Sequence, residues 1–285
     1  MKNIPWSKPQ LNSQDKEYLN KALNSTWISD GEYVKKFQNL VRKKIKRKYA
    51  LTASSGTTAI HLAFLSLDLR RNDEIIVPAY GYMAGANIGR LMGLKVKFCE
   101  VSIKTYCVTL QSIKRSITKK TKAVVVINTY GNMGEIYKIS KFLKKKKIFL
   151  IEDAAESLGS KTFNIISGKF GDISTFSFQS TKNVTTGEGG MVLTDNAVIS
   201  KKIKLYRSHG VEKERYKHLV YGHNFRLSNL LASIGFSQFK RIDKINKKKI
   251  YLYKQYLRYL KKENIIIKNF SINQNSIPWT FPLTL

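Results

Sequence analysis

Short apolar runs alternate with helix-like segments through residue 194, and this alternation limits the possible folds more than any other feature of the chain. The runs are rich in Val, Ile, Phe and Thr, as strands usually are, and turn residues bound them. There are seven of them: residues 49–53, 74–77, 95–98, 123–127, 148–151, 174–178 and 191–194. Strands that alternate with helices are typical of a mainly parallel sheet with helices on both faces. The sequence therefore predicts an α/β fold around a seven-stranded sheet.

The helical segments between these runs show apolar residues three and four positions apart. In one of them Val34, Phe37 and Val41 fall on the same face. We expect helices over residues 13–23, 33–45, 109–117, 134–144 and 197–206, shorter ones after the turns at 54–58 and 78–82, and one very long helix over 228–261.

Length and charge bound the classes of protein that this chain can represent. At 285 residues the chain can bury one large core, or one large and one small domain. The net charge of +32 is typical of proteins that bind nucleic acid or an anionic surface. The basic residues are spread in short clusters, however, and the chain is also rich in Ile and Asn, which favours a compositional bias of the genome. Both interpretations stay open.

The two cysteines, Cys99 and Cys107, have neither the spacing of a metal site nor that of a disulfide framework. We find no leader sequence, and no apolar run approaches the roughly 20 residues that cross a bilayer. We therefore expect a cytoplasmic protein without a membrane span or a metal site.

A small-residue turn, Ser54–Thr58, connects the first predicted strand to a helix. A helix that begins in this way leaves unpaired backbone N–H groups and the positive end of its dipole facing outward, and a phosphate group suits both. Ser and Thr are also ordinary helix N-caps, so this motif is weak by itself.

A lysine lies between two predicted buried strands, in the run Phe176–Met191. Lys182 occupies the irregular loop, and a Gly-rich turn leads into the second strand. A desolvated amine loses its proton more readily, which is what a nucleophile requires. The alternative is that Lys182 is simply one of 51 Lys and Arg residues, most of which must be solvated.

Acidic residues follow the apolar strand 148–151, beginning with Glu152 and Asp153 and continuing with Glu156. The carboxyl ends of strands are where open α/β sheets bind their ligands. We therefore expect one of these carboxylates to take part in a binding site.

The run Phe176–Met191, read with its flanks, resembles the lysine segment of the DegT/DnrJ/EryC1/StrS family. These are aminotransferases that use pyridoxal 5'-phosphate and act on nucleotide-linked keto sugars, and the resemblance covers essentially the whole chain. It implies the aspartate-aminotransferase-like architecture (fold type I). In this family the lysine that matches Lys182 carries the cofactor, whereas dehydratase relatives have histidine there. Gln179–Ser180 stands where many members have His-Pro.

The resemblance also implies roles for the other residues singled out above. Ser55, Gly56 and Thr57 match the family's phosphate cradle, to which Ser177 adds a hydroxyl. Tyr82 matches the aromatic residue that lies on the cofactor ring. Asp153 matches the carboxylate that keeps the ring nitrogen protonated. The resemblance further places Glu156 near the ring oxygen and implies that Asn224 reaches the cofactor phosphate of a neighbouring subunit in a homodimer.

The function implied is amino transfer from an amino acid, glutamate by family habit, to the 4-keto or 3-keto group of a nucleotide-linked deoxysugar, for surface polysaccharide biosynthesis. Details at Tyr130–Asn132 favour perosamine-synthase-like members that act at C4. A positive field would help to attract an anionic sugar nucleotide, and nucleic acid is not expected as a partner. Two alternatives are a dehydratase of the same fold and an inactive relative that binds anionic polymers.

The predicted domains are a large cofactor-binding domain, residues 1–240, and a small C-terminal domain that begins in residues 241–285. Residues 277–285 look like the first strand of that small domain. Because a lone strand leaves its pairing groups unsatisfied, we expect a C-terminally truncated, incomplete small domain.

Overall fold

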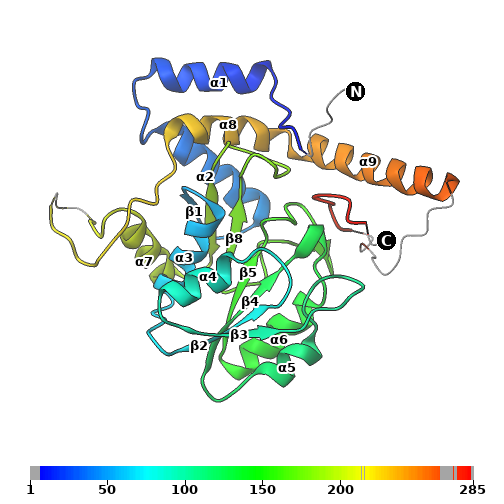
Figure 1. Ribbon diagram of the computed structural model, residues 1–285. Coiled ribbons are helices and arrows are strands. Elements are labelled where there is room, and N and C mark those ends of the chain that lie inside the picture. The colour runs from blue at the N-terminus through cyan, green and yellow to red at the C-terminus, as the bar shows by residue number, and fades with distance from the viewer. Residues whose placement is uncertain (1–6, 213, 215, 264–271, 273–274, 284–285) are drawn as a thin grey trace.

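The computed structural model describes residues 7–212, 214, 216–263, 272 and 275–283. One seven-stranded sheet forms its centre, with the strand order β1-β9-β8-β5-β4-β2-β3 (Figure 1). The strands are β1 (Tyr49–Ala53), β2 (Glu74–Pro78), β3 (Lys95–Cys99), β4 (Thr121–Ile127), β5 (Phe149–Asp153), β8 (Ile173–Ser177) and β9 (Gly190–Thr194). All seven predicted strands therefore belong to one sheet.

Strand β9 is antiparallel to both of its neighbours, β1 and β8, whereas all other neighbouring strands in the sheet are parallel. The prediction of a mainly parallel sheet is confirmed. A separate hairpin of β6 (Lys161–Thr162) and β7 (Ile165–Ile166) was not predicted, because each of its strands is only two residues long.

Helices cover both faces of the sheet, as predicted (Figure 1). Their bounds are α1 (Ser13–Asn24), α2 (Glu32–Ile45), α3 (Gly56–Ser66), α4 (Ala84–Leu91), α5 (Leu110–Ser116), α6 (Ile136–Lys146), α7 (Ala197–Arg207), α8 (Asn229–Lys240) and α9 (Ile242–Lys262), with a 3-10 turn η1 (Thr129–Gly131). No described helix is long and apolar enough to span a membrane.

Alternating strand residues enter different cores, as the pleat requires. Ile75 and Val77 pack with α3, α4 and α7 on one face. Ile76, between them, packs with α5 and α6 on the other. Helices α2 and α8 cover that second face over β8 and β9. Successive residues at the end of a strand therefore point to opposite sides of the sheet.

The prediction of one very long helix after residue 228 is wrong. The chain forms α8 and α9, separated at Arg241, whose backbone angles of φ −112° and ψ 19° are not helical. The hydrophobic pattern continues through Arg241 because both helices keep an apolar face, so the pattern alone does not reveal the break. The break falls beside the predicted domain boundary, and that boundary remains a prediction.

The prediction of a strand over residues 277–285 is also wrong for its described part. Residues 275–283 contain no strand and pack as an irregular segment. The backbone N–H of Ile277 donates to Ser160 Oγ at 2.8 Å, and the N–H of Lys161 donates to the carbonyl of Asn275 at 2.9 Å. These contacts with a loop satisfy backbone groups that the prediction had assigned to a sheet.

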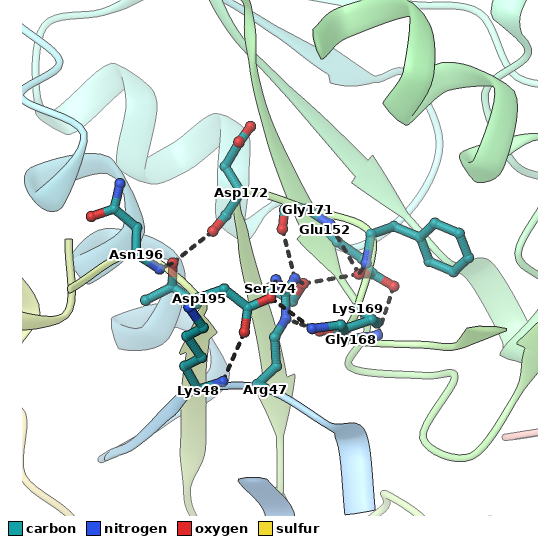
Figure 2. Close-up of polar contacts among 12 residues, drawn as sticks. Arg47, Lys48, Glu152, Gly168, Lys169, Gly171, Asp172, Ser174, Asp195 and Asn196 are labelled. Carbon is teal, nitrogen blue, oxygen red and sulfur yellow. Dashed lines mark hydrogen bonds and ion pairs between the residues drawn. The ribbon is translucent and has the colours of Figure 1, made fainter. Parts of the chain in front are cut away.

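A buried polar network supports the end of β5 on the face covered by α2 (Figure 2). Arg47 donates to the carbonyls of Gly168 and Gly171 and to Ser174 Oγ, at 2.6–2.9 Å. Ser174 Oγ in turn donates to Glu152 Oε2 at 2.9 Å. The loop 168–171 is therefore held from two sides, which fixes the position of the strand end beside it.

Candidate active site

The small-residue turn forms the N-terminus of α3, as predicted. Ser55 is its N-cap: Ser55 Oγ accepts from the N–H of Thr58 at 3.1 Å, and Thr58 Oγ1 accepts from the N–H of Ser55 at 2.9 Å. This capping box leaves the N–H groups of Gly56 and Thr57 in the first turn, where a helix supplies no acceptor of its own. The turn can therefore bind an anion.

Ser177, at the end of β8, reaches this turn from the sheet. A Cβ atom added to Gly56 would lie 2.8 Å from Ser177 Cβ, so glycine is what allows the two segments to approach. A Cβ added to Gly190 would lie only 2.1 Å from the carbonyl oxygen of Ser55. The fold therefore brings Ser177 next to the predicted cradle residues Ser55, Gly56 and Thr57, although it follows them by more than a hundred residues in the sequence.

The alternation of side chains distinguishes between the two acids at the end of β5. Glu152 points into the Arg47 network, whereas Asp153 lies on the α3 side, like Ile151 two residues before it. Asp153 is buried, and its Oδ1 accepts from the N–H of Ala155 at 3.0 Å. Burial raises the pKa of the Asp153 carboxyl, and the nearby Lys182 opposes that shift. Asp153 is thus a buried carboxyl on the α3 side of the sheet.

Lys182 and Glu156 form a largely buried pair near Asp153. Lys182 Nζ lies 3.7 Å from Glu156 Oε1, and the two side chains are only 14% and 10% exposed. Burial lowers the pKa of Lys182, and the attraction of Glu156 and Asp153 offsets part of that shift. Burial likewise raises the pKa of Glu156. Lys182 is therefore not one of the solvated surface lysines, and its amine gives up a proton more readily than a free lysine does.

Tyr82 and Asn224 are more exposed than the other predicted site residues. Tyr82 lines the same small cavity as Asp153, but 75% of its surface is exposed. Asn224 is exposed and accepts from Arg226 Nε at 3.1 Å. The residue after it, Phe225, accepts the N–H of Ser54 at 2.9 Å, so the Asn224 segment adjoins the phosphate turn. The roles of both residues remain predictions.

Trp279 is a site residue that the sequence did not reveal. Its ring centroid lies 3.7 Å from Lys182 Nζ, and its indole N–H donates to the carbonyl of Thr181 at 2.9 Å. The sequence placed Trp279 in a strand of a second domain, and no local motif connects it with the lysine loop. Only the fold brings the two segments together.

The residues of this site fit pyridoxal 5'-phosphate in three respects. A helix N-terminus with a serine beside it suits the phosphate. A buried carboxyl in a cavity wall suits a protonated ring nitrogen. A buried lysine with a lowered pKa suits the carbonyl group of the cofactor.

Fold and site together define a protein of the pyridoxal-phosphate fold type I class, and comparison with known proteins identifies the family. Residues 9–284 match the model of the DegT/DnrJ/EryC1/StrS aminotransferase family. This chain belongs to that family. The predicted family, fold and cofactor are confirmed.

Known relatives agree with this membership. The chain is 40% identical to GDP-perosamine synthase of Escherichia coli O157:H7 over 245 residues, which span 85% of this chain and 67% of that relative. It superimposes with a TM-score of 0.88, at 28% identity, on an E. coli GDP-4-keto-6-deoxy-D-mannose-3-dehydratase with bound hydrated PLP, covering 97% of this chain and 77% of that one. It also superimposes on the Helicobacter pylori aminotransferase PseC, which is involved in the biosynthesis of pseudoaminic acid. The TM-score is 0.86 at 29% identity, and the match covers 91% of this chain and 71% of that one.

Proposed function

We propose that this protein transfers an amino group from an amino acid, glutamate first among the candidates, to a keto group of a nucleotide-linked deoxysugar. The observation that carries the proposal is the buried Lys182, paired with Glu156 and near Asp153. GDP-perosamine synthases of E. coli and Vibrio cholerae are 40% and 38% identical to this chain, which favours a GDP-linked 4-keto sugar.

Six groups would hold the cofactor. The N–H groups of Gly56 and Thr57, with the Ser55 and Ser177 hydroxyls, would bind its phosphate. Asp153 would stand at the ring nitrogen, and Tyr82 would cover the ring. When bound, pyridoxal 5'-phosphate supplies an electron sink beside the carbon that loses a proton.

The chemistry assigned to this chain's own residues is proton transfer by Lys182. Its lowered pKa makes the neutral amine more accessible than in a solvated lysine. A neutral amine can accept the α-proton of the amino donor in the first half-reaction, and in the second its protonated form can deliver a proton to the sugar carbon that receives the nitrogen. Glu156, 3.7 Å from Nζ, would hold the amine in place and stabilise it once it is protonated. Burial excludes water, which would otherwise compete for the proton.

Several further features belong to this proposal. Asn224 would contact the cofactor phosphate of a partner subunit, as the resemblance to the family implies, and its side chain is exposed in this chain. That role requires a homodimer. Residues 1–240 would form the cofactor-binding domain and residues 241–285 the beginning of the small domain. The product would serve polysaccharide biosynthesis in the cytoplasm.

A dehydratase of the same fold is the second candidate. An E. coli O55:H7 enzyme named GDP-4-keto-6-deoxy-D-mannose 3-dehydratase is 30% identical to this chain. The dehydratase relatives have histidine at the position of Lys182, and lysine there favours amino transfer. A dehydratase would remove a hydroxyl from the sugar without leaving nitrogen on it.

The experiment starts with an absorbance scan of the protein after addition of pyridoxal 5'-phosphate. We expect a band near the visible edge that is absent in Lys182→Ala. The loaded protein is then incubated with glutamate and a GDP-linked 4-keto-6-deoxy sugar. Formation of 2-oxoglutarate and of an amino sugar, by mass spectrometry, supports the proposal. A sugar product that has lost oxygen without gaining nitrogen indicates the dehydratase, and the absence of a lysine-dependent band contradicts the aminotransferase.

A further inference from the structure

The irregular segment 275–283 contacts both the turn η1 and the lysine loop. Gly131, in that turn, allows the segment to approach closely. Gly131 has φ +95°, and a Cβ added there would lie 2.0 Å from the carbonyl oxygen of Ile277. Ser160 Oγ donates to the carbonyl of Gly131 at 2.8 Å and accepts the N–H of Ile277 at 2.8 Å. Two residues further along, this anchoring delivers Trp279 to the site.

Trp279 contacts the lysine loop through two different parts of its side chain. Its indole N–H donates to the carbonyl of Thr181 at 2.9 Å, which fixes the backbone just before the lysine. Its ring face lies under the amine, with the ring centroid 3.7 Å from Lys182 Nζ. An ammonium group at this distance from an indole face is attracted by the ring quadrupole.

The same ring reaches the partner of the lysine through Tyr130. The rings of Trp279 and Tyr130 lie nearly parallel, with an interplanar angle of 15° and centroids 6.3 Å apart. The backbone N–H of Tyr130 donates to Glu156 Oε2 at 2.7 Å, and Glu156 Oε1 lies 3.7 Å from Lys182 Nζ. The contacts therefore form a closed circuit that returns to the amine.

We propose that Trp279 is a positioning residue for Lys182: it fixes the lysine loop by a hydrogen bond, and its ring face and the Glu156 carboxylate hold the amine between them. The inference rests on the proposed role of Lys182. A lysine side chain has several rotatable bonds and loses much conformational freedom when it is held in one geometry. The contacts with Trp279 order the Lys182 side chain before the reaction begins, and this fixed geometry favours proton transfer in one direction.

The first test needs no cofactor and uses the emission of Trp279 itself. The sequence has three tryptophans, and changing Trp6 and Trp27 to Phe leaves Trp279 as the only one. Emission is followed from about pH 6 to about pH 11. We expect a change with a midpoint below 10.5, the ordinary lysine value, because deprotonation of Lys182 removes a charge from the ring face. The change should vanish when Lys182→Met is added. The same curve with methionine at 182 would overturn the proposal.

The second test compares Trp279→Phe with Trp279→Leu by the rate at which the lysine-dependent absorbance band forms with pyridoxal 5'-phosphate. Only the neutral amine reacts, so the midpoint of the pH profile reports the pKa of Lys182. Phenylalanine keeps a ring face, and its midpoint should stay near that of the unchanged protein. Leucine excludes water but has no such face, and we expect a midpoint lower by roughly 0.5 to 1.5 pH units.

Equal midpoints for the Phe and Leu variants would contradict an effect of the ring face, whether both shift or neither does. If Trp279→Leu does not fold, the emission titration still decides. An emission change that depends on Lys182, together with no absorbance band in the unchanged protein, would support the positioning role and contradict the cofactor assignment. The two proposals can therefore fail separately.

Discussion

Glu152 and Asp153 are adjacent acids at the end of one strand, and their surroundings could hardly differ more. Glu152 accepts from Asn128 Nδ2, Ser174 Oγ and three backbone N–H groups of the loop 168–171. The side-chain carboxylate of Asp153 accepts a hydrogen bond from the backbone N–H of Ala155. One carboxylate is fully used in holding the fold, whereas the other keeps capacity to bind a ligand.

The difference shows how a sheet separates stability from function. Because successive residues point to opposite faces, the same strand end supplies an acid that holds the fold to the α2 side and an acid proposed to bind the cofactor to the α3 side. Hydrogen bonds to a buried carboxylate stabilise its charged form, whereas burial with few hydrogen bonds destabilises that form and raises the pKa. Predictions about this pair test the separation directly.

The largest effect should be on catalysis. Asp153→Asn should reduce the transamination rate by on the order of 100-fold or more, because an amide cannot keep the ring nitrogen protonated. Glu152→Gln, in protein that remains folded, should retain a rate within about tenfold of the original. Single-turnover kinetics with glutamate measures both. Equal losses in the two variants would contradict the division of roles.

Stability should show the opposite order. Glu152→Gln presents an NH₂ group to donors that need an acceptor, and should lower the free energy of unfolding by about 2 to 4 kcal/mol. Below pH 3.8, where the Asp153 carboxyl is protonated, Asp153→Asn exchanges two neutral groups and should change it by less than about 1 kcal/mol. Urea denaturation checks both. The control is Glu100→Gln, since Glu100 is 79% exposed in its pair with Arg115 and should also cost less than about 1 kcal/mol.

The third prediction concerns pH. The folded pKa of Asp153 is raised above its ordinary value of 3.8, so between these two values the folded state binds more protons than the unfolded state. The contribution of Asp153 to stability is therefore present below pH 3.8 and is lost as the pH rises through the folded pKa, by at most about 1.4 kcal/mol per pH unit. Urea midpoints measured across this range should fall more steeply with pH for the original protein than for Asp153→Asn. Parallel curves would show that Asp153 does not titrate with a raised pKa.

The smallest effect should come from the phosphate turn. Gly56→Ala places a methyl group 2.8 Å from Ser177 Cβ, closer than van der Waals contact allows, so the turn and the strand end must move apart. We expect the affinity for pyridoxal 5'-phosphate to fall by about tenfold, or about 1.4 kcal/mol. Equilibrium titration of the absorbance band measures the affinity. An unchanged affinity would mean that this turn does not hold the phosphate.

Much of this fold could be read from the sequence because its signals are local. Each of the seven strands is a short β-branched or aromatic run, and the turn at Ser55 carries its own capping residues. The break at Arg241 escaped because an apolar pattern reports which residues face the core and not whether the helix axis continues.

The candidate site divides in the same way. The sequence by itself determined which residues have the right chemistry: the lysine in its loop, the acids after an apolar strand and the small-residue turn. The tertiary structure decided which of them meet, since burial and distance depend on the whole chain. It assigned Glu152 to the scaffold and Asp153 to the site, paired Lys182 with Glu156, and brought Trp279 over the amine. A side chain's chemistry is a property of its residue, whereas its pKa and its neighbours are properties of the fold.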